Sequence, residues 1–256
     1  MVRRMWKLKV KRTTQRLGSV EMLNSGDSTQ KAGKRKEIHH DEEEGREAGN
    51  KMRKLSDSSE MGLGNPLSAG ALSDWCWREC PNIVFLMETM ICKKDLDRIR
   101  NRCGFTTGLC IGSRGKSGGM AFWWRNIDVE LLSYNAHHVA VKVRKENDEG
   151  WWKGIGIYGW PEFCNKYKTW DMLRSLCYGD NIPTILFGDF NEILSNNEKE
   201  GGVMRHGRQM EAFRNALDDC ALHDFGFTGN KFTWQRGKEV GRMIRERLDR
   251  AVANAE

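Results

Sequence analysis

The sequence has few prolines and lacks any long apolar segment. Only 4 of its 256 residues are proline, and glycine does not recur at every third position, which excludes collagen-like and proline-rich fibrous proteins. The longest apolar run near the middle covers residues 83–87, far fewer than the roughly 20 residues that cross a bilayer. We therefore expect no membrane-spanning segment.

Cysteine pairs of the kind that bind zinc are also missing. The 8 cysteines are irregularly spaced, and none stands in a Cys-x-x-Cys pattern. This spacing argues against a structural zinc site and against a regular disulfide framework. No apolar stretch of a secretory signal peptide is present either. We expect reduced thiols in an intracellular compartment.

Aromatic residues are almost absent from the first part of the chain. Residues 1–60 contain Trp6 as their one aromatic side chain, and all the cysteines lie in residues 61–256. A segment with so little apolar surface cannot offset the entropy that ordering costs. The composition therefore predicts a disordered tail over residues 1–60 and one folded domain over residues 61–256.

The tail carries two basic clusters, Lys-Arg-Lys at 34–36 and Lys-Met-Arg-Lys at 51–54, separated by an acidic run at 41–44. On a flexible segment, such clusters predict a nuclear-import signal, and hence a nuclear location, or a weak contact with phosphate groups. A solvated linker without a specific role has the same composition. The first 20 residues are basic and contain no acidic side chain, so an organelle transit peptide stays open as an alternative.

Residues 61–256 alternate between helical and strand patterns. Asn65 is a suitable helix cap, and Pro66 suits the first helical position. The periodicity predicts helices over 66–80, 93–103, 162–178 and about 210–220. It predicts strands over 83–87, 120–124, 129–134, 139–143, 151–158, 183–187, 232–234 and 244–248. Strands grouped in hairpins, with helices between others, predict an α/β fold in which two sheets pack face to face with helices outside.

Polar side chains stand directly at the ends of three predicted strands. These are Glu88, Tyr158, and the pair Asp189 and Asn191. If the strand ends share one rim, these side chains surround one point. A hard divalent ion such as Mg²⁺ prefers such oxygen ligands and keeps waters for phosphate contact. Glu88 would bind the ion, Asp189 would orient or deprotonate a water, and Asn191 would hold the water or the phosphate, which suits in-line attack on a phosphodiester.

Each of these residues, taken alone, has a simpler interpretation. Asp189 or Asn191 could be a turn residue or a helix cap. Glu88 could be a solvated residue after a strand, and Tyr158 could be an aromatic residue of the core or its rim. The spacing by itself does not decide between these interpretations.

Five short motifs occur in a fixed order along the chain. They are Phe-Leu-Met-Glu-Thr at 85–89, Gly-Ile-Tyr-Gly-Trp-Pro at 156–161, Gly-Asp-Phe-Asn at 188–191, Phe-Thr-Trp at 232–234 and Arg-Leu-Asp-Arg at 247–250. Together they resemble the endonuclease/exonuclease/phosphatase superfamily, and more closely the endonuclease domain of plant LINE-type (non-LTR) retrotransposons. The resemblance covers about residues 61–256. It implies a four-layer α/β sandwich of two packed mixed sheets flanked by helices. It also implies phosphodiester or phosphomonoester cleavage with Mg²⁺, or Mn²⁺, and DNA as the substrate in the mobile-element branch.

The resemblance assigns roles to the matching residues. Glu88 resembles the metal-binding glutamate of the family, and Tyr158 resembles the tyrosine near the scissile phosphate. Asp189 and Asn191 resemble the pair that positions the nucleophile. Asp249 resembles the aspartate that orients a catalytic histidine.

Trp234 stands where the family places an aromatic residue near the nucleic acid. A core tryptophan on a short strand would look the same in the sequence. The segments around 117–120 and 224–227 also fit the family, and we interpret them as structural.

Two elements of the family pattern have no counterpart. Gly-Leu-Gly-Asn-Pro at 62–66 is present, but Ser59 stands where the metal-shell asparagine would fall and Met61 where an arginine would fall. The charged tail replaces the preceding strand. The terminal Ser-Asp-His segment is absent, so no histidine follows Asp249. The resemblance therefore predicts a nuclease domain truncated at both ends, with weak or no activity.

Other functions stay open at this stage. A phosphatase of small phosphorylated molecules would share the same core site. A non-catalytic nucleic-acid binder would use the basic tail and the remnant groove, and its affinity would fall steeply with salt. A degenerate element product with no selected role is a further alternative. No obligate protein partner is implied.

Overall fold

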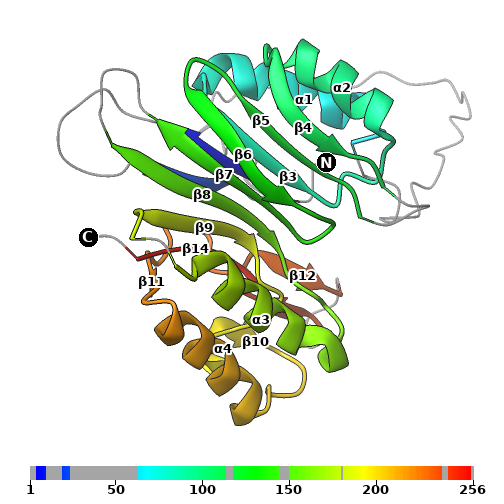
Figure 1. Cartoon of the computed structure of the whole chain (residues 1–256). Helices are drawn as coiled ribbons and strands as arrows, with labels where there is room; N and C mark the ends of the chain where they lie inside the picture. Colours follow the sequence, from blue (N-terminus) through cyan, green and yellow to red (C-terminus); the bar gives the residue numbers. More distant parts are fainter. Residues whose placement is uncertain are drawn as a thin grey trace, which may run out of the picture.

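The computed structural model describes residues 4–9, 19–23, 63–113, 118–144, 150–179, 181–237 and 242–254. Figure 1 shows four layers, with helices α1 and α2 on one side, α3 and α4 on the other, and two sheets between them. The helices of the outer layers are α1 Pro66–Glu79, α2 Lys93–Arg102, α3 Lys166–Cys177 and α4 Gly207–Asp219. The predicted α/β class and four-layer architecture are confirmed.

The first sheet has five strands in the order β2-β1-β3-β5-β4, and every pair in it is antiparallel. Its strands are β1 Arg4–Lys9, β2 Ser19–Leu23, β3 Ile83–Met87, β4 Thr107–Ile111 and β5 Met120–Trp124. Helix α1 begins as the sequence predicts, because Oδ1 of Asn65 accepts a hydrogen bond from the Leu67 N–H at 2.9 Å. Leu72 and Trp75 of this helix pack against the outer face of the sheet.

The second sheet has six strands in the order β11-β14-β9-β8-β7-β6. Its strands are β6 Asp128–Tyr134, β7 His138–Arg144, β8 Trp151–Tyr158, β9 Thr184–Asp189, β11 His223–Asp224 and β14 Asp249–Ala253. Only β8 and β9 pair in parallel, because helix α3 carries the chain between them. This sheet is therefore mixed, as expected. The expectation of a mixed first sheet is wrong, since β3 lies antiparallel to both of its neighbours.

The two sheets meet across an aromatic core. The ring of Phe85 on β3 lies 5.9 Å from that of Phe122 and 5.8 Å from that of Phe187 on β9. Gly156 on β8 makes room for this cluster, because a Cβ atom there would come within 2.7 Å of the Phe85 ring. The glycine of the Gly-Ile-Tyr-Gly motif thus has a packing role.

Two segments of the charged N-terminal region form strands. β1 pairs antiparallel with β3, with Trp6 opposite Phe85, and β2 pairs with β1. The sequence did not predict these two strands: β1 completes hydrogen bonds along an edge of β3, and β2 completes those along β1. The prediction of a disordered tail over the rest of residues 1–60 stays a prediction. The other residues of 1–62, including both basic clusters, Ser59 and Met61, lie outside the described part of the chain.

A small third sheet has the order β10-β13-β12. Its strands are β10 Lys199–Glu200, β12 Trp234–Arg236 and β13 Ile244–Glu246. The single strand expected over 244–248 is wrong, since the chain leaves β13 at Glu246 and enters the six-stranded sheet at Asp249. The turn between β13 and β14 is what carries Asp249 to the rim of the larger sheet.

No described helix combines the length and the apolar character that crossing a membrane requires. All eight cysteines lie in the described residues, and none of them forms a disulfide bond.

Candidate active site at the strand ends

The ends of three adjacent strands bring Tyr158, Asp189 and Asp249 to one level of the six-stranded sheet. Tyr158 is the last residue of β8, and its register partner is Asp189, the last residue of β9. Asp189 is in turn the register partner of Asp249, the first residue of β14. Register partners on neighbouring strands project their side chains from the same face of a sheet. The three side chains therefore form a row along this rim.

Glu88 joins the row from the other sheet. It directly follows β3, and the Tyr158 hydroxyl donates a hydrogen bond to its Oε1 at 3.1 Å. The backbone of Glu88 is left-handed, with φ of 50°, a conformation that costs free energy for a residue with a side chain. The N–H of the next residue, Thr89, donates to the Gly119 carbonyl at 3.2 Å.

Gly119 itself has a φ of 87°, and a Cβ atom there would stand 2.4 Å from the Thr89 hydroxyl. The described part of the segment at 117–120 is therefore structural, as predicted. It holds the turn that presents Glu88.

Asn191 is fixed by a tight turn after β9. Its N–H donates to Asp189 Oδ1 at 2.8 Å, and its own Nδ2 donates to the Gly159 carbonyl at 2.8 Å. Gly159 N–H donates to the Asp189 carbonyl at 2.7 Å. The simpler interpretation, that Asp189 and Asn191 are turn residues, is therefore correct for their local geometry. The same turn locks both side chains at the rim beside Tyr158.

Asp189 and Asp249 are almost fully buried, with exposed fractions of 1% and 2%. The N–H groups of Leu248 and Asp249 both donate to Thr233 Oγ1 at 3.0 Å, which fixes the start of β14. Two carboxyl groups side by side offer oxygen ligands of the kind that a hard cation prefers.

Trp234 begins β12 and is half-buried. Its side chain packs against a small apolar cluster of Ile193, Met210 and Leu248. The structure therefore gives Trp234 a packing role beside Leu248. A contact between Trp234 and nucleic acid stays a prediction.

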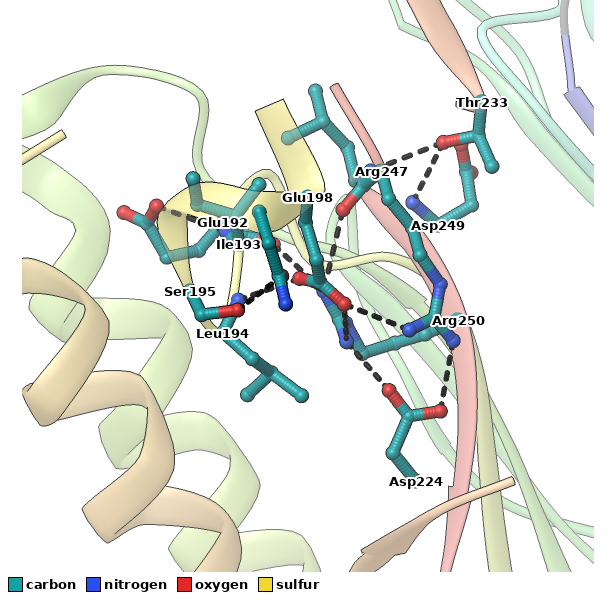
Figure 2. Close-up of polar contacts among 12 residues, drawn as sticks. Glu192, Ile193, Leu194, Ser195, Glu198, Asp224, Thr233, Arg247, Asp249 and Arg250 are labelled. Carbon is teal, nitrogen blue, oxygen red and sulfur yellow. Dashed lines mark hydrogen bonds and ion pairs between the residues drawn. The ribbon is translucent and has the colours of Figure 1, made fainter. Parts of the chain in front are cut away.

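The Arg-Leu-Asp-Arg motif contains two arginines whose role the sequence did not reveal. Figure 2 shows that Arg247 and Arg250, on either side of Asp249, bind the same two carboxylates. Arg247 donates to Glu198 Oε1 at 2.7 Å and to Asp224 Oδ1 at 2.9 Å. Arg250 donates to Glu198 Oε2 at 2.8 Å and to Asp224 Oδ2 at 2.6 Å. The four side chains form a closed ring that fixes Asp249 in the chain between them.

The ring is buried, and this affects Glu198 electrostatically. Burial opposes ionisation of Glu198, but the hydrogen bonds and charges of Arg250 and Arg247 outweigh it, and the pKa of Glu198 lies below its usual value. Asp224 lies in the segment at 224–227, which is therefore structural, as predicted.

A second group of buried ions supports Asn191. Lys166 on α3 donates from Nζ to the Asn191 carbonyl, and the same Nζ lies 3.1 Å from Glu192 Oε2. Arg205 lies 3.4 Å from Glu192 Oε1 and 2.8 Å from Glu246 Oε2. Burial lowers the pKa of Lys166, although the charge of Glu192 opposes the shift. Glu192 directly follows the Gly-Asp-Phe-Asn motif, so its position in the sequence could have marked it as a residue of the site. No spacing in the sequence indicated that Lys166 belongs to the site.

The residues at the rim suit a hard divalent ion. The described residues contain no cluster of three or more His, Cys, Asp or Glu side chains arranged around a metal position. Mg²⁺, however, binds through one or two carboxylates and keeps several waters. Within the described part of the chain, Oε2 of Glu88 makes no hydrogen bond, whereas Oε1 accepts one from Tyr158. Glu88, with Asp189 and Asn191 nearby, therefore fits the ligand chemistry of such an ion.

The four-layer fold is similar to that of several solved nuclease structures. The structure is similar to the endonuclease domain of TRAS1, a telomere-specific non-LTR retrotransposon, with a TM-score of 0.53, 15% identity, and coverage of 73% of this chain and 80% of that one. It is also similar to the AP endonuclease LMAP from Leishmania major, with a TM-score of 0.57, 14% identity, and coverage of 75% of each chain. The predicted likeness to the endonuclease/exonuclease/phosphatase superfamily and to a retrotransposon endonuclease is confirmed for the fold.

A third similar structure is a 3′ phosphatase from Neisseria bound to a product DNA hairpin, with a TM-score of 0.54, 14% identity, and coverage of 75% of this chain and 82% of that one. No protein-family model matches the sequence. No curated protein matches it either. At these identities the likeness concerns the fold.

Proposed function

We propose that this chain is a phosphodiesterase that hydrolyses DNA with the help of a divalent cation, as a retrotransposon-type endonuclease. The observation that carries the proposal is the row of Tyr158, Asp189 and Asp249, with Glu88 hydrogen-bonded to Tyr158 from the facing sheet. Such a set of oxygen ligands and fixed polar groups suits in-line attack of water on a phosphodiester.

Each rim residue has a defined part in this proposal. Glu88 would hold Mg²⁺ or Mn²⁺, and the bound ion would stabilise negative charge that develops on the phosphate. Asp189 would orient or deprotonate the attacking water, since Asn191 N–H fixes its Oδ1. Asn191 has Oδ1 and its second amide hydrogen for the water or the phosphate, because one amide hydrogen is given to Gly159. Asp249 would help to orient the groups beside Asp189.

DNA is the proposed substrate because two of the similar structures are a retrotransposon endonuclease domain and a 3′ phosphatase bound to a product DNA hairpin. A 3′ phosphatase is the competing activity, and it would use the same rim. We propose that turnover is low, because Ser59 and Met61 replace an asparagine and an arginine of the family pattern. Loss of one charge-stabilising group typically costs about 10²–10³-fold in rate.

The test is nicking of supercoiled plasmid by the full chain in Mg²⁺, in Mn²⁺ and in EDTA. We expect slow, metal-dependent nicking that is lost in Glu88→Ala and Asp189→Ala. Asp171→Ala is the matched control, because Asp171 is exposed on α3 and its one ion pair among the described residues is with Arg174, at 3.5 Å. The control should nick like the unmodified protein.

Other outcomes separate the alternatives. Release of phosphate from a 3′-phosphorylated oligonucleotide, without plasmid nicking, would favour the phosphatase. Salt-sensitive DNA binding without any hydrolysis would favour a non-catalytic binder. Nicking that persists in Asp189→Ala would end the proposal for this rim.

A further inference from the structure

His137 lies beside the rim, directly before the first residue of β7. Strand β7 pairs antiparallel with β8 up to His138 and Ile157. Continuing this register by one residue places His137 opposite Tyr158. The row at the strand ends therefore extends over four adjacent strands, with His137 at one end of it.

Two hydrogen bonds fix His137 against Tyr158. The Tyr158 N–H donates to the His137 carbonyl at 2.8 Å, and the His137 Nδ1 lies 2.9 Å from the Tyr158 carbonyl. Because a carbonyl oxygen only accepts, Nδ1 must carry a proton. In the neutral imidazole, Nε2 then has a free lone pair and acts as an acceptor.

Nε2 is the second nitrogen of the His137 ring, and the residue is half-buried. Within the described residues this nitrogen makes no hydrogen bond, and it is not one of the buried polar atoms that lack a partner. Burial of the ring lowers the pKa of His137, and the nearby charges of Glu162 and Lys168 act in opposite directions on it. Burial thus favours the neutral form of the imidazole.

The ring of His137 is also held by stacking. Its centroid lies 3.5 Å from that of the Trp160 ring, with an angle of 15° between the planes. It is nearly parallel to the Tyr158 ring, at 9° and 6.2 Å. Trp160 is anchored to α3, since its N–H donates to Thr169 Oγ1 at 3.0 Å. Aromatic side chains grouped in this way are the usual contact surface for unpaired bases.

We propose that His137 contacts substrate, and that its Nε2 accepts a hydrogen bond from an N–H donor of a nucleobase next to the cleaved phosphate. A phosphate oxygen is an acceptor and does not pair with a neutral Nε2, whereas base amino and imino groups are donors. This assignment rests on the proposed function, because it takes nucleic acid as the ligand of the rim.

Two substitutions distinguish a direct contact of His137 with the base from an indirect role in which His137 only supports Tyr158. His137→Asn places an amide near the Nδ1 position, which keeps the donor to the Tyr158 carbonyl and removes Nε2. His137→Gln places its amide near the Nε2 position and restores an acceptor there. His223→Asn is the matched control, since His223 is exposed on β11 at the far edge of the same sheet.

The measurement is fluorescence anisotropy of the full chain with two labelled probes in Ca²⁺, a mixed-sequence single-stranded DNA and a uniformly abasic strand of equal length. We expect His137→Asn to weaken binding of the base-containing probe by about 3- to 10-fold, the size of one hydrogen bond. Binding of the abasic probe should not change. His137→Gln should recover most of the loss, and His223→Asn should bind like the unmodified protein.

Equal weakening of both probes by His137→Asn would mean that the residue acts only through Tyr158, and it would overturn the proposal. Unchanged binding of the base-containing probe would also overturn it, as would failure of the unmodified protein to bind that probe. Thermal melting of each variant checks that it folds. If the unmodified protein binds DNA but never hydrolyses it, the nuclease proposal fails, and the result for His137 still stands by itself.

Discussion

The hydroxyl of Tyr158 donates a hydrogen bond to Oε1 of Glu88 at 3.1 Å, although the two residues are 70 positions apart in the chain. One residue ends a strand of the six-stranded sheet, and the other follows a strand of the five-stranded sheet. The bond joins the rims of the two sheets at the place where the proposed metal ligand stands. It orients the Glu88 carboxylate and leaves Oε2 for a ligand.

Removal of this hydroxyl should slow DNA hydrolysis. We expect Tyr158→Phe to reduce kcat by about 10²-fold, as for other donors that orient charge in an active site. KM should change little, because the aromatic ring stays in place. Nicking kinetics with a linear duplex measure both constants. Tyr178→Phe is the control, since Tyr178 is 88% exposed; equal activity of both variants would remove Tyr158 from the site.

The ring around Asp249 should be a main source of stability. Glu198→Gln leaves Arg247 and Arg250 buried with half of their negative partners, and we expect a loss of about 3–5 kcal/mol in the free energy of unfolding. Urea denaturation measures it. Asp219→Asn removes the exposed ion pair with Arg174, of 2.8 Å, and should cost less than about 1 kcal/mol. Similar losses in the two variants would show that the ring contributes little.

The stability should fall in acid. The folded-state pKa values of Glu198 and Glu246 lie below the usual 4.5, because the arginine and lysine partners outweigh burial. A carboxylate with a lowered folded pKa stabilises the fold above its unfolded pKa, and this contribution is lost as pH falls through the folded value. We therefore expect a loss that begins near pH 4.5 and grows below it. Urea midpoints between pH 3 and 8 would measure it.

His137 and His138 should cause a second, smaller loss of folding stability, which begins at a higher pH than the loss from the carboxylates. Burial lowers the pKa of both imidazoles below the usual 6.5, so the folded state binds fewer protons than the unfolded one. Their contribution is present above pH 6.5 and declines as pH falls below it. In the Glu198→Gln variant, the fall in stability near pH 4.5 should become smaller, whereas the fall that the two histidines cause should stay the same. An unchanged acid decline would contradict the assignment to Glu198.

Lys166 and Glu192 should be energetically coupled. Lys166→Met removes the donor to the Asn191 carbonyl and half of the cationic partners of Glu192, so we expect it to lower stability by about 3–5 kcal/mol. The double substitution Lys166→Met with Glu192→Gln removes both charges and should cost less than the sum of the single changes. A double-mutant cycle in urea measures the coupling. Additive losses would show that the two residues do not interact.

Much of the fold could be predicted from local patterns. The apolar run of β3 and the alternation in β7 gave strand positions that the structure confirms within a residue. Asn65 and Pro66 marked the start of α1 correctly. Strand β4 was missed, because Thr107–Ile111 contains glycine and has no clear alternation. β1 was missed because its stability comes from pairing with β3, which composition does not report.

The amino-acid sequence by itself determined which residues end strands and which motifs occur in which order, because those properties depend on neighbours along the chain. It could not show that Tyr158, Asp189 and Asp249 share one level, since sheet register fixes that. Nor could it show that Arg247 and Arg250 close a ring with Glu198 and Asp224, or that Lys166 holds Asn191. Those contacts join residues far apart in the chain. Only the packing of the sheets, the loop after β9 and helix α3 brings them together.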